Sequence, residues 1–443
     1  MSFYPSGLAS AAISARELSR SSLRIRLRLI AFLIAALGLA AASSAQSYQI
    51  FADEYQRILT ETRWKLGPFR IYPALAIRDV GFDDNLYFGT DEGKPVKDFT
   101  ATVSPEVRIY WPLRTRLLLY VRENPEYAYF RKESYQRSFT NSYGAGFRYL
   151  LLGRFVLSAD AGNDKHRRRI SSEFQIPAND RVRSIAAGLS YETARKTSIG
   201  ITAAVRKISY EEVMILPEAV PVERLLDRED REIAAEAYYQ LFSDGYLFFR
   251  GGFQEYRFVD ETAVWRNASA TDIRAGLRFP LLGRIRGVLN LGYKLFDPKT
   301  AGEPKYAGLV GNTGLDLRTG RFAVRLQFVR DLVFSTYSEV FYYVEDSVRL
   351  GGSVYLTPFL KIDYDFSRGR ADYSTRPMPS GGEGAEASGE REDRHRLHSL
   401  GLIFRIFKTA GVGLSWNAER WTSGFSNFDR TRNFVGLVLN KTF

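Results

Sequence analysis

The side chains that could carry out acid–base or metal chemistry are few and scattered in this sequence. Its 443 residues contain three histidines, His166, His395 and His398, and no cysteine. It has no Gly-x-Ser-x-Gly elbow, no histidine pair at zinc-ligand spacing and no phosphate-binding glycine loop. Ser399 follows His398, and adjacent residues of a strand point to opposite faces, so these two cannot act as nucleophile and base. We therefore predict no enzyme activity, no cofactor and no metal site.

Charged side chains are the other source of chemistry, and basic ones predominate. The sequence carries 62 Lys and Arg residues against 50 Asp and Glu, a formal net charge of +12. A guanidinium binds carboxylate or phosphate groups through two parallel hydrogen bonds, so arginines that share a surface can attract anionic solutes. The basic residues are spread along the whole chain, which argues against a nucleic-acid partner. The elements that carry the arginines decide which of them share a surface.

Apolar and polar residues alternate over most of the chain. In FTATVSPEVRIYW (99–111), Phe99, Val103 and Trp111 stand at odd positions, and Thr100 and Arg108 stand at even ones. This period of two predicts a strand with one apolar and one polar face. No apolar run of about 18 residues, the length of a membrane helix, follows position 45. The pattern therefore excludes a membrane protein built from helices.

The same alternation recurs along the chain and predicts eighteen strands. Their expected ranges are 69–80, 99–111, 116–129, 139–151, 154–163, 182–193, 197–207, 232–241, 246–257, 271–279, 284–295, 306–318, 321–331, 346–356, 360–368, 395–406, 411–420 and 431–443.

Short and long connections alternate between these strands. Short turns such as PLRT (112–115) and RTGR (318–321) join one strand to the next, and longer polar segments follow each pair. Outer-membrane barrels have short periplasmic turns and long external loops. A soluble sheet of this size would need a second layer, and no amphipathic helices remain to supply it. We therefore predict an all-β fold, a single antiparallel up-and-down barrel in the bacterial outer membrane, with its apolar face toward lipid and its polar face toward the lumen.

Aromatic residues stand on the predicted apolar face near both ends of the strands. Such girdles mark the two membrane interfaces of a barrel. Near the short turns they are Trp111, Tyr149, Phe155, Tyr191, Tyr239, Phe279, Phe322 and Phe404, and near the long loops they are Phe99, Tyr129, Phe139, Phe253, Tyr293 and Phe328.

The N-terminal segment has the pattern of a secretory signal peptide. The basic stretch RIRLR (24–28) precedes the apolar run LIAFLIAALGLAAA (29–42), and small residues lead up to a predicted cut after Ala45. We therefore assign 1–45 to a cleaved signal peptide and 67–443 to the barrel. Residues 46–66 form either a short amphipathic periplasmic helix or a simple linker.

The last strand ends NFVGLVLNKTF, with Val435, Leu437, Leu439 and Phe443 on one face. This ending resembles the C-terminal sorting signal of bacterial outer-membrane barrels. The resemblance implies recognition of the last strand by the barrel-assembly machinery. Lys441 departs from the hydrophobic residue usual at its place.

A second resemblance lies in the first predicted strand, PALAIRDVGFDDNLYF (73–88). The residues that carry it are Gly81, Phe82, Asp83, Asp84, Asn85, Leu86 and Tyr87. They are similar to the first-strand signature of a family of bacterial outer-membrane barrel porins often linked to exopolysaccharide or capsule production. The resemblance implies a porin-like channel, with a polysaccharide or periplasmic export components as partners. Read from the residues alone, the carboxylates belong to a turn without a metal or catalytic role.

Two functions are compatible with these observations. The first is a channel for polar, anionic solute, with a role in exopolysaccharide export or secretion. The alternative is a structural or adhesive barrel whose lumen is blocked and whose external loops act. The candidate pore-lining, anion-binding residues on the polar face are Arg108, Arg122, Arg148, Arg274, Arg278, Arg286, Arg325 and Arg349.

The stretch 271–295 is expected to concentrate positive charge on one wall of the lumen. A PLLG turn would place Arg278 opposite Arg286 and Arg274 beside Asn290, with no inward carboxylate on either strand. The two readings are an anion-binding stripe and a solvated wall whose carboxylates reach across from other strands.

The long connection 208–231 also allows two readings. It contains Met214, Ile215, Leu216, Val220, Leu225 and Leu226, enough apolar surface to fold back on the barrel. The alternative is a plain hairpin extension of two strands.

Deleting Phe443 tests the proposed sorting signal. We expect less protein in the outer membrane and more periplasmic precursor exposed to proteolysis, because the last strand must close the barrel against the first. Heat-modifiable gel migration measures the folded fraction. An unchanged folded fraction would show that Phe443 is merely a lipid-facing side chain.

Overall fold

In a computed structural model, the described residues are 50–62, 64–89, 95–168, 178–211, 222–242, 245–281, 285–336, 340–374, 392–407, 410–423 and 429–442. The predicted signal peptide (1–45) and Phe443 lie outside these ranges.

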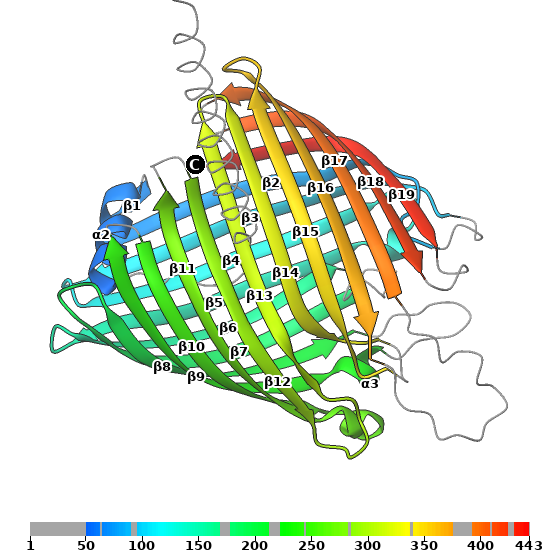
Figure 1. The fold of residues 1–443 in the computed structure, drawn as a ribbon. Helices are drawn as coiled ribbons and strands as arrows, with labels where there is room; N and C mark the ends of the chain where they lie inside the picture. Colours follow the sequence, from blue (N-terminus) through cyan, green and yellow to red (C-terminus); the bar gives the residue numbers. More distant parts are fainter. Residues whose placement is uncertain are drawn as a thin grey trace, which may run out of the picture.

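Within the described residues, eighteen strands form one closed antiparallel barrel, which confirms the predicted fold (Figure 1). Each strand pairs with the next along the chain, and the last pairs with the first. A short additional strand, β1 (Trp64–Leu66), pairs with the start of the first barrel strand. The barrel strands are β2 (Phe69–Asp83), β3 (Asp98–Leu113), β4 (Leu117–Phe130), β5 (Ser138–Leu151), β6 (Phe155–Arg168), β7 (Ala178–Glu192), β8 (Ser198–Tyr210), β9 (Arg228–Phe242), β10 (Gly245–Phe258), β11 (Ala268–Leu281), β12 (Ile285–Pro298), β13 (Tyr306–Thr319), β14 (Phe322–Phe334), β15 (Tyr342–Tyr355), β16 (Leu360–Tyr373), β17 (Glu392–Phe407), β18 (Ala410–Ser423) and β19 (Arg430–Thr442).

Many strands extend further than predicted at the rim with the long connections. β16 continues to Tyr373 rather than 368, and β15 begins at Tyr342 rather than 346. In β16 the outward residues of the extension, Arg370 and Asp372, are charged. The hydrophobic alternation therefore ends before the backbone pairing does, because the hairpins continue beyond the apolar band.

The outer surface of the barrel is apolar around its middle. Ile185 and Ile273 are each 68% exposed, and aromatic residues such as Trp111, Phe322 and Phe139 are exposed toward the two rims. Such a band is unfavourable in water and favourable in a bilayer, where a closed barrel also leaves no strand edge unpaired. No helix among the described residues is long and apolar enough to span a membrane. The apolar band and the closure of the barrel identify the protein as an integral outer-membrane barrel, with the short turns on the periplasmic side.

The first and last strands meet at a seam built from the Gly81–Tyr87 motif. Asp83 is 2% exposed and accepts from Arg432 Nε at 2.9 and 3.0 Å. Asp84 accepts from the backbone and side chain of Asn433 at 2.6 and 3.0 Å. A Cβ at Gly81 would clash with the carbonyl of Val435, so this close approach requires glycine. The carboxylates of the motif thus join β2 to β19.

The remaining motif residues lie at this seam or next to it. The Asn85 amide donates to the carbonyls of Gly89 and Thr431 at 2.9 and 2.8 Å. Leu86 is buried, Phe82 is exposed on the outer face, and the Tyr87 hydroxyl donates to Glu133 at 2.7 Å.

A helix, α2 (Phe51–Glu61), lies inside the barrel wall at the periplasmic end (Figure 1). Its apolar face buries Phe51, Tyr55 and Ile58 against Leu118 of β4 and Val156 of β6. These strand residues have the inward parity, so the helix occupies part of the lumen. The period of the apolar residues explains why 46–66 could be read as a helix before its position was known.

Polar contacts hold α2 against this wall. Glu54 pairs with Arg148 of β5, and the carboxylate of Glu192 accepts from the Phe51 amide at 3.2 Å. Lys196 pairs with Asp53 at 2.8 Å. An acidic first turn beside basic wall residues fits the positive end of the helix dipole.

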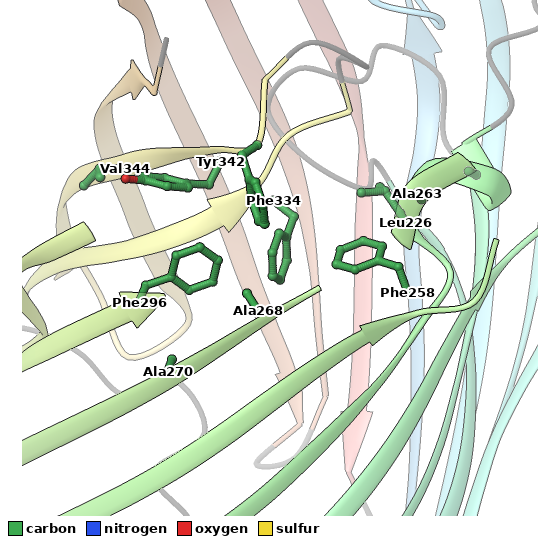
Figure 2. Packing of buried hydrophobic residues seen from close by; sticks show 11 residues of the cluster. Leu226, Phe258, Ala263, Ala268, Ala270, Phe296, Phe334, Tyr342 and Val344 are labelled. Carbon is green, nitrogen blue, oxygen red and sulfur yellow. The ribbon is translucent and has the colours of Figure 1, made fainter. Parts of the chain in front are cut away.

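A cluster of aromatic and aliphatic side chains fills part of the extracellular end (Figure 2). Phe296 packs edge to face against Phe334 and Phe341, with ring centroids 6.0 and 5.5 Å apart. Leu226, in the short helix α3 (Val222–Leu226), packs into the same cluster. β8 and β9 also extend the 208–231 hairpin beyond the predicted strands, so both readings of this connection hold in part. Met214, Ile215, Leu216 and Val220 lie outside the described residues.

Arg266 ties three extracellular connections together. It ends the 3-10 helix η2 (Glu261–Arg266) and is fully buried. Its guanidinium donates to the carbonyls of Ser335 at 2.6 Å, Val340 at 3.0 Å and Leu225 at 3.5 Å. The charge of a single side chain therefore satisfies carbonyls from α3 and from the connection between β14 and β15.

Replacing Arg266 by Met should loosen this end of the barrel and leave the strands intact. Methionine fills similar volume but donates no hydrogen bonds, and each buried carbonyl left unpaired costs about 1–3 kcal/mol. We expect faster hydrogen exchange in 222–226, 261–266 and 340–342, while the exposed control Arg257→Met exchanges as the unmodified protein does. Unchanged hydrogen exchange of these segments in Arg266→Met would show that Arg266 does not hold the three connections together.

Candidate functional site

The lumen is the candidate site, and strand parity decides which side chains line it. Val121, Ile273 and Val348 are exposed on the outer face. Because successive side chains of a strand alternate, the neighbouring Arg122, Arg274 and Arg349 point inward. The same parity directs the other candidates inward, namely Arg108, Arg148, Arg278, Arg286 and Arg325. Their role in binding anions remains a prediction.

Most of these inward arginines have a carboxylate partner. Arg122 pairs with Asp164 at 2.9 Å, Arg325 with Asp316 at 3.0 Å and Arg349 with Asp365 at 3.3 Å. Arg108 pairs with Glu106 at 2.5 Å, and Arg148 pairs with Glu54 of α2. Much of the positive charge predicted for the lumen is therefore balanced locally.

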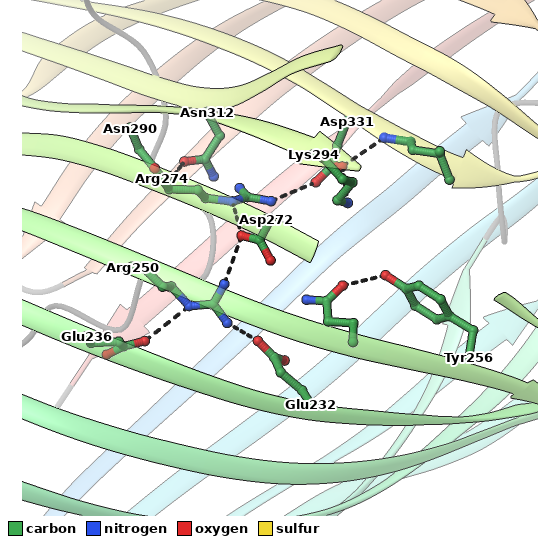
Figure 3. Close-up of polar contacts among 12 residues, drawn as sticks. Glu232, Glu236, Arg250, Tyr256, Asp272, Arg274, Asn290, Lys294, Asn312 and Asp331 are labelled. Carbon is green, nitrogen blue, oxygen red and sulfur yellow. Dashed lines mark hydrogen bonds and ion pairs between the residues drawn. The ribbon is translucent and has the colours of Figure 1, made fainter. Parts of the chain in front are cut away.

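Arg250 is the centre of a denser network on the wall formed by β9 to β14 (Figure 3). It pairs with Glu232, with Glu236 at 3.2 Å and with Asp272 at 3.1 Å. Asp272 is fully buried and also accepts from Arg274 Nε at 2.8 Å. One guanidinium of β10 thus contacts three carboxylates from the two neighbouring strands, β9 and β11.

The network continues along the wall to the next basic residues. Arg274 reaches Asp331 at 3.6 Å, and the Lys294 ammonium donates to the same carboxylate at 2.6 Å. Lys294 is only 5% exposed, so this charge has little access to water. Charges this deeply placed are stable when each has a partner, and they bind a solute poorly because the partner already occupies the donors.

The predicted arrangement of the 271–295 wall is wrong in two respects. Arg278 lies opposite Val288, and Arg286 lies opposite Pro280, because pairing continues to Leu281 and Ile285 and moves the register by two residues. Arg274 lies opposite Gly292 rather than beside Asn290. Asp272 is an inward carboxylate on the same strand, which the prediction had excluded.

Three inward arginines on neighbouring strands near the periplasmic end differ from the paired ones. Arg278, Arg286 and Arg318 stand at the periplasmic ends of β11, β12 and β13. Within the described part of the chain, no carboxylate lies within ion-pair distance of any of them. Asp316 is opposite Arg286 in register, but it pairs with Arg325. This group therefore has an excess of positive charge that no nearby carboxylate of the described residues balances.

Polarity changes with depth along this wall. The aromatic cluster lies at the extracellular end, and the Arg250 network follows below it. Asn290 then donates to Asn312 at 3.2 Å, and the unpaired arginines come last, toward the periplasm. A solute crossing the lumen would meet apolar, charge-neutral and then positively charged surfaces in that order.

Other predicted features do not contribute to the lumen. The Gly81–Tyr87 motif builds the seam, and Val435, Leu437 and Leu439 lie on the outer face. Among the residues with described positions, no group of histidine and carboxylate side chains is arranged to hold a metal ion.

Sequence reasoning did not identify Asp83, Glu232 and Asp272 as inward carboxylates, although Asp83 belongs to the Gly81–Tyr87 motif. Asp272 has the same parity as Arg274, two residues along β11, so the alternation already contained the signal. Glu232 and Asp83 lay at or beyond the predicted strand ends, where hydrophobic alternation had stopped. Their burial could not be inferred without the pairing of the neighbouring strands.

No protein-family model and no curated protein matches the chain. Solved structures of Pseudomonas aeruginosa proteins are similar to it. OccK1 (OpdK) has a TM-score of 0.50 at 11% identity, covering 84% of this chain and 98% of its own. OccK2 (OpdF), solved in complex with glucuronate, has a TM-score of 0.48 at 13% identity, covering 84% and 97%. The similarity to OccK1 shows the outer-membrane porin fold, and at 11% identity it carries no site residue across.

Replacing Arg250 by Met should destabilise the barrel strongly. The change leaves Glu232, Glu236 and Asp272 without their shared cation, and breaking a buried ion pair costs about 3–5 kcal/mol. Denaturant unfolding in detergent micelles measures the loss. The control Arg349→Met removes an exposed lumen pair, which is worth about 0–1 kcal/mol. Equal stability of the two variants would contradict the role of the network.

Proposed function

We propose that the barrel conducts small anionic solutes across the outer membrane and that Arg278, Arg286 and Arg318 supply its preference for anions. The observation that supports this proposal is that these inward guanidiniums have no carboxylate partner among the described residues. A paired arginine contributes little net potential at a distance, whereas an unpaired one attracts anions into a narrow channel. Arg278 and Arg286 come from the sequence prediction, and Arg318 replaces Arg274 in the group.

Small solutes fit this lumen better than a polymer does. α2 occupies part of the periplasmic end, and the aromatic cluster occupies part of the extracellular end. Both are held by buried contacts, so neither leaves its place without losing them. Exopolysaccharide export, which the sequence resemblance implied, therefore does not enter the proposal.

The chemistry of the solute follows from the arginines. A guanidinium offers a planar fork that matches a carboxylate or phosphate group. Arginines on neighbouring strands allow a solute to pass from one fork to the next before it leaves the channel. The proposed cargo is therefore a small carboxylated or phosphorylated molecule.

The blocked-lumen alternative also has support from a specific observation. The aromatic cluster and α2 fill opposite ends of the lumen, which is the arrangement that a closed structural barrel would have. On this reading the external connections tied by Arg266 would carry the function.

Reversal potentials in a salt gradient test the anion preference. The triple variant Arg278→Ser, Arg286→Ser, Arg318→Ser should lower the anion-to-cation permeability ratio roughly two- to fivefold at low salt, because each charge at about 10 Å contributes about 0.4 kcal/mol in water and more in a narrow channel. The difference should shrink as the salt concentration rises.

The control removes a whole ion pair from the lumen, as Arg349→Gln with Asp365→Asn. This change keeps the net charge, so the reversal potential should stay as in the unmodified protein. Cation preference in the unmodified protein, or an unaltered potential in the triple variant, would refute the assignment.

A further inference from the structure

Three arginines form a row on the outer face of β16, β17 and β18. Arg396 is the direct cross-strand partner of Arg368 on one side and of Arg420 on the other. All three are exposed. They share the parity of Leu400 and Trp416, which are exposed on the apolar outer surface. The row therefore faces the surroundings of the barrel and not the lumen.

The rows on either side give the height of the arginines. From the arginines toward the middle of the membrane, the next row of outward-facing side chains is Phe366, His398 and Ala418. The row after it is Tyr364, Leu400 and Trp416. Amphipathic aromatic residues mark the interface between hydrocarbon and headgroups. The arginine row lies just outside this aromatic layer, at the level where lipid headgroups begin.

The next row of arginines, farther from the membrane, has carboxylate partners within the protein, and this row differs from it. Arg370 pairs with Asp372 at 2.6 Å, and Arg394 pairs with Glu392. Throughout the described ranges, no carboxylate lies within ion-pair distance of Arg368, Arg396 or Arg420. The nearest outward carboxylates on these strands, Asp372 and Glu392, thus stand two rows farther from the membrane, within reach of Arg370 and Arg394.

A row of arginines without counter-charges lowers the stability of the isolated protein. Directly opposed side chains have Cβ atoms about 5 Å apart, and like charges at these positions destabilise a sheet. Water and salt reduce the repulsion at the surface, but the side of the row that faces the aromatic layer has little water. A bound anion at the same height would remove the repulsion.

We propose that Arg368, Arg396 and Arg420 bind the phosphate groups of a phosphorylated lipid in the outer leaflet. Guanidiniums bind phosphate through paired, charge-assisted hydrogen bonds, and neighbouring ones can share one phosphate. The acyl chains of the lipid would lie on the apolar surface directly below, which includes Leu400 and Leu414. The charge of the row and its continuity with the apolar band together select a lipid and not a soluble anion.

Outward arginines on other strands provide a matched contrast. Arg231 pairs with Glu229 at 2.6 Å, Arg257 with Glu255 at 2.7 Å and Arg330 with Asp346 at 2.6 Å. Each already has an anion from the protein, so a lipid phosphate gains little there. These three serve as the control set.

The test titrates purified protein in detergent with the bisphosphorylated, acylated glucosamine disaccharide that anchors lipopolysaccharide, and native mass spectrometry counts the bound lipid. The triple variant Arg368→Gln, Arg396→Gln, Arg420→Gln should bind one lipid fewer and show an affinity lower by roughly tenfold or more, the loss expected for several charge-assisted hydrogen bonds. The control triple Arg231→Gln, Arg257→Gln, Arg330→Gln should bind as the unmodified protein does. Heat-modifiable migration confirms that each variant is folded.

Two further arms identify the ligand chemistry. The dephosphorylated lipid should bind the unmodified protein and the triple variant with the same weak affinity. Inorganic phosphate should not displace the intact lipid from the unmodified protein. The single variant Arg396→Lys keeps the charge without the fork and should fall between the two. The proposal would be overturned if the triple variant bound the intact lipid as tightly as the unmodified protein does. It would also be overturned if the unmodified protein bound the dephosphorylated lipid as tightly as the intact lipid, or if inorganic phosphate displaced the intact lipid.

Discussion

The pairing of every backbone amide and carbonyl within the membrane is the constraint on which this structure depends. Lipid offers no hydrogen bonds, so a sheet in a bilayer must close on itself. Closure here requires β2 and β19 to meet, and the Asp83 and Arg432 pair, the contacts of Asp84 with Asn433 and the bare backbone of Gly81 all serve that meeting. The acidic motif near the start of the chain is therefore explained by closure and not by binding.

Closure then dictates where charge must go. Once the apolar face is turned to lipid, alternation sends the polar side chains of all strands into one confined lumen. Most of them balance each other there, as Arg250 does with carboxylates from the two neighbouring strands. Among the described residues, two groups of arginines on neighbouring strands have no carboxylate within ion-pair distance: Arg278, Arg286 and Arg318 inside the barrel, and Arg368, Arg396 and Arg420 outside it. In both places we infer that the missing negative charge is supplied by a ligand: an anionic solute in the lumen and a lipid phosphate on the outer face.

The fold could be predicted from the sequence because a period of two is a strong local signal that every strand repeats. The lumen could be predicted in part, since parity places Arg278 and Arg286 inward without any knowledge of the neighbours. Ion pairing could not be predicted, because it depends on register: a shift of two residues at Leu281 and Ile285 separates Arg278 from Arg286. The role of α2 was equally hidden, since its apolar face shows that it packs but not against which wall.

The central claim is that a continuous, water-filled path runs through this lumen past α2 and the aromatic cluster. The most direct test is a current recording from the folded protein in a planar bilayer of neutral lipid. The account predicts discrete, steady open steps whose conductance rises with salt concentration. Protein that is folded by heat-modifiable migration, inserts into the bilayer and passes no current would contradict the account and favour the blocked barrel.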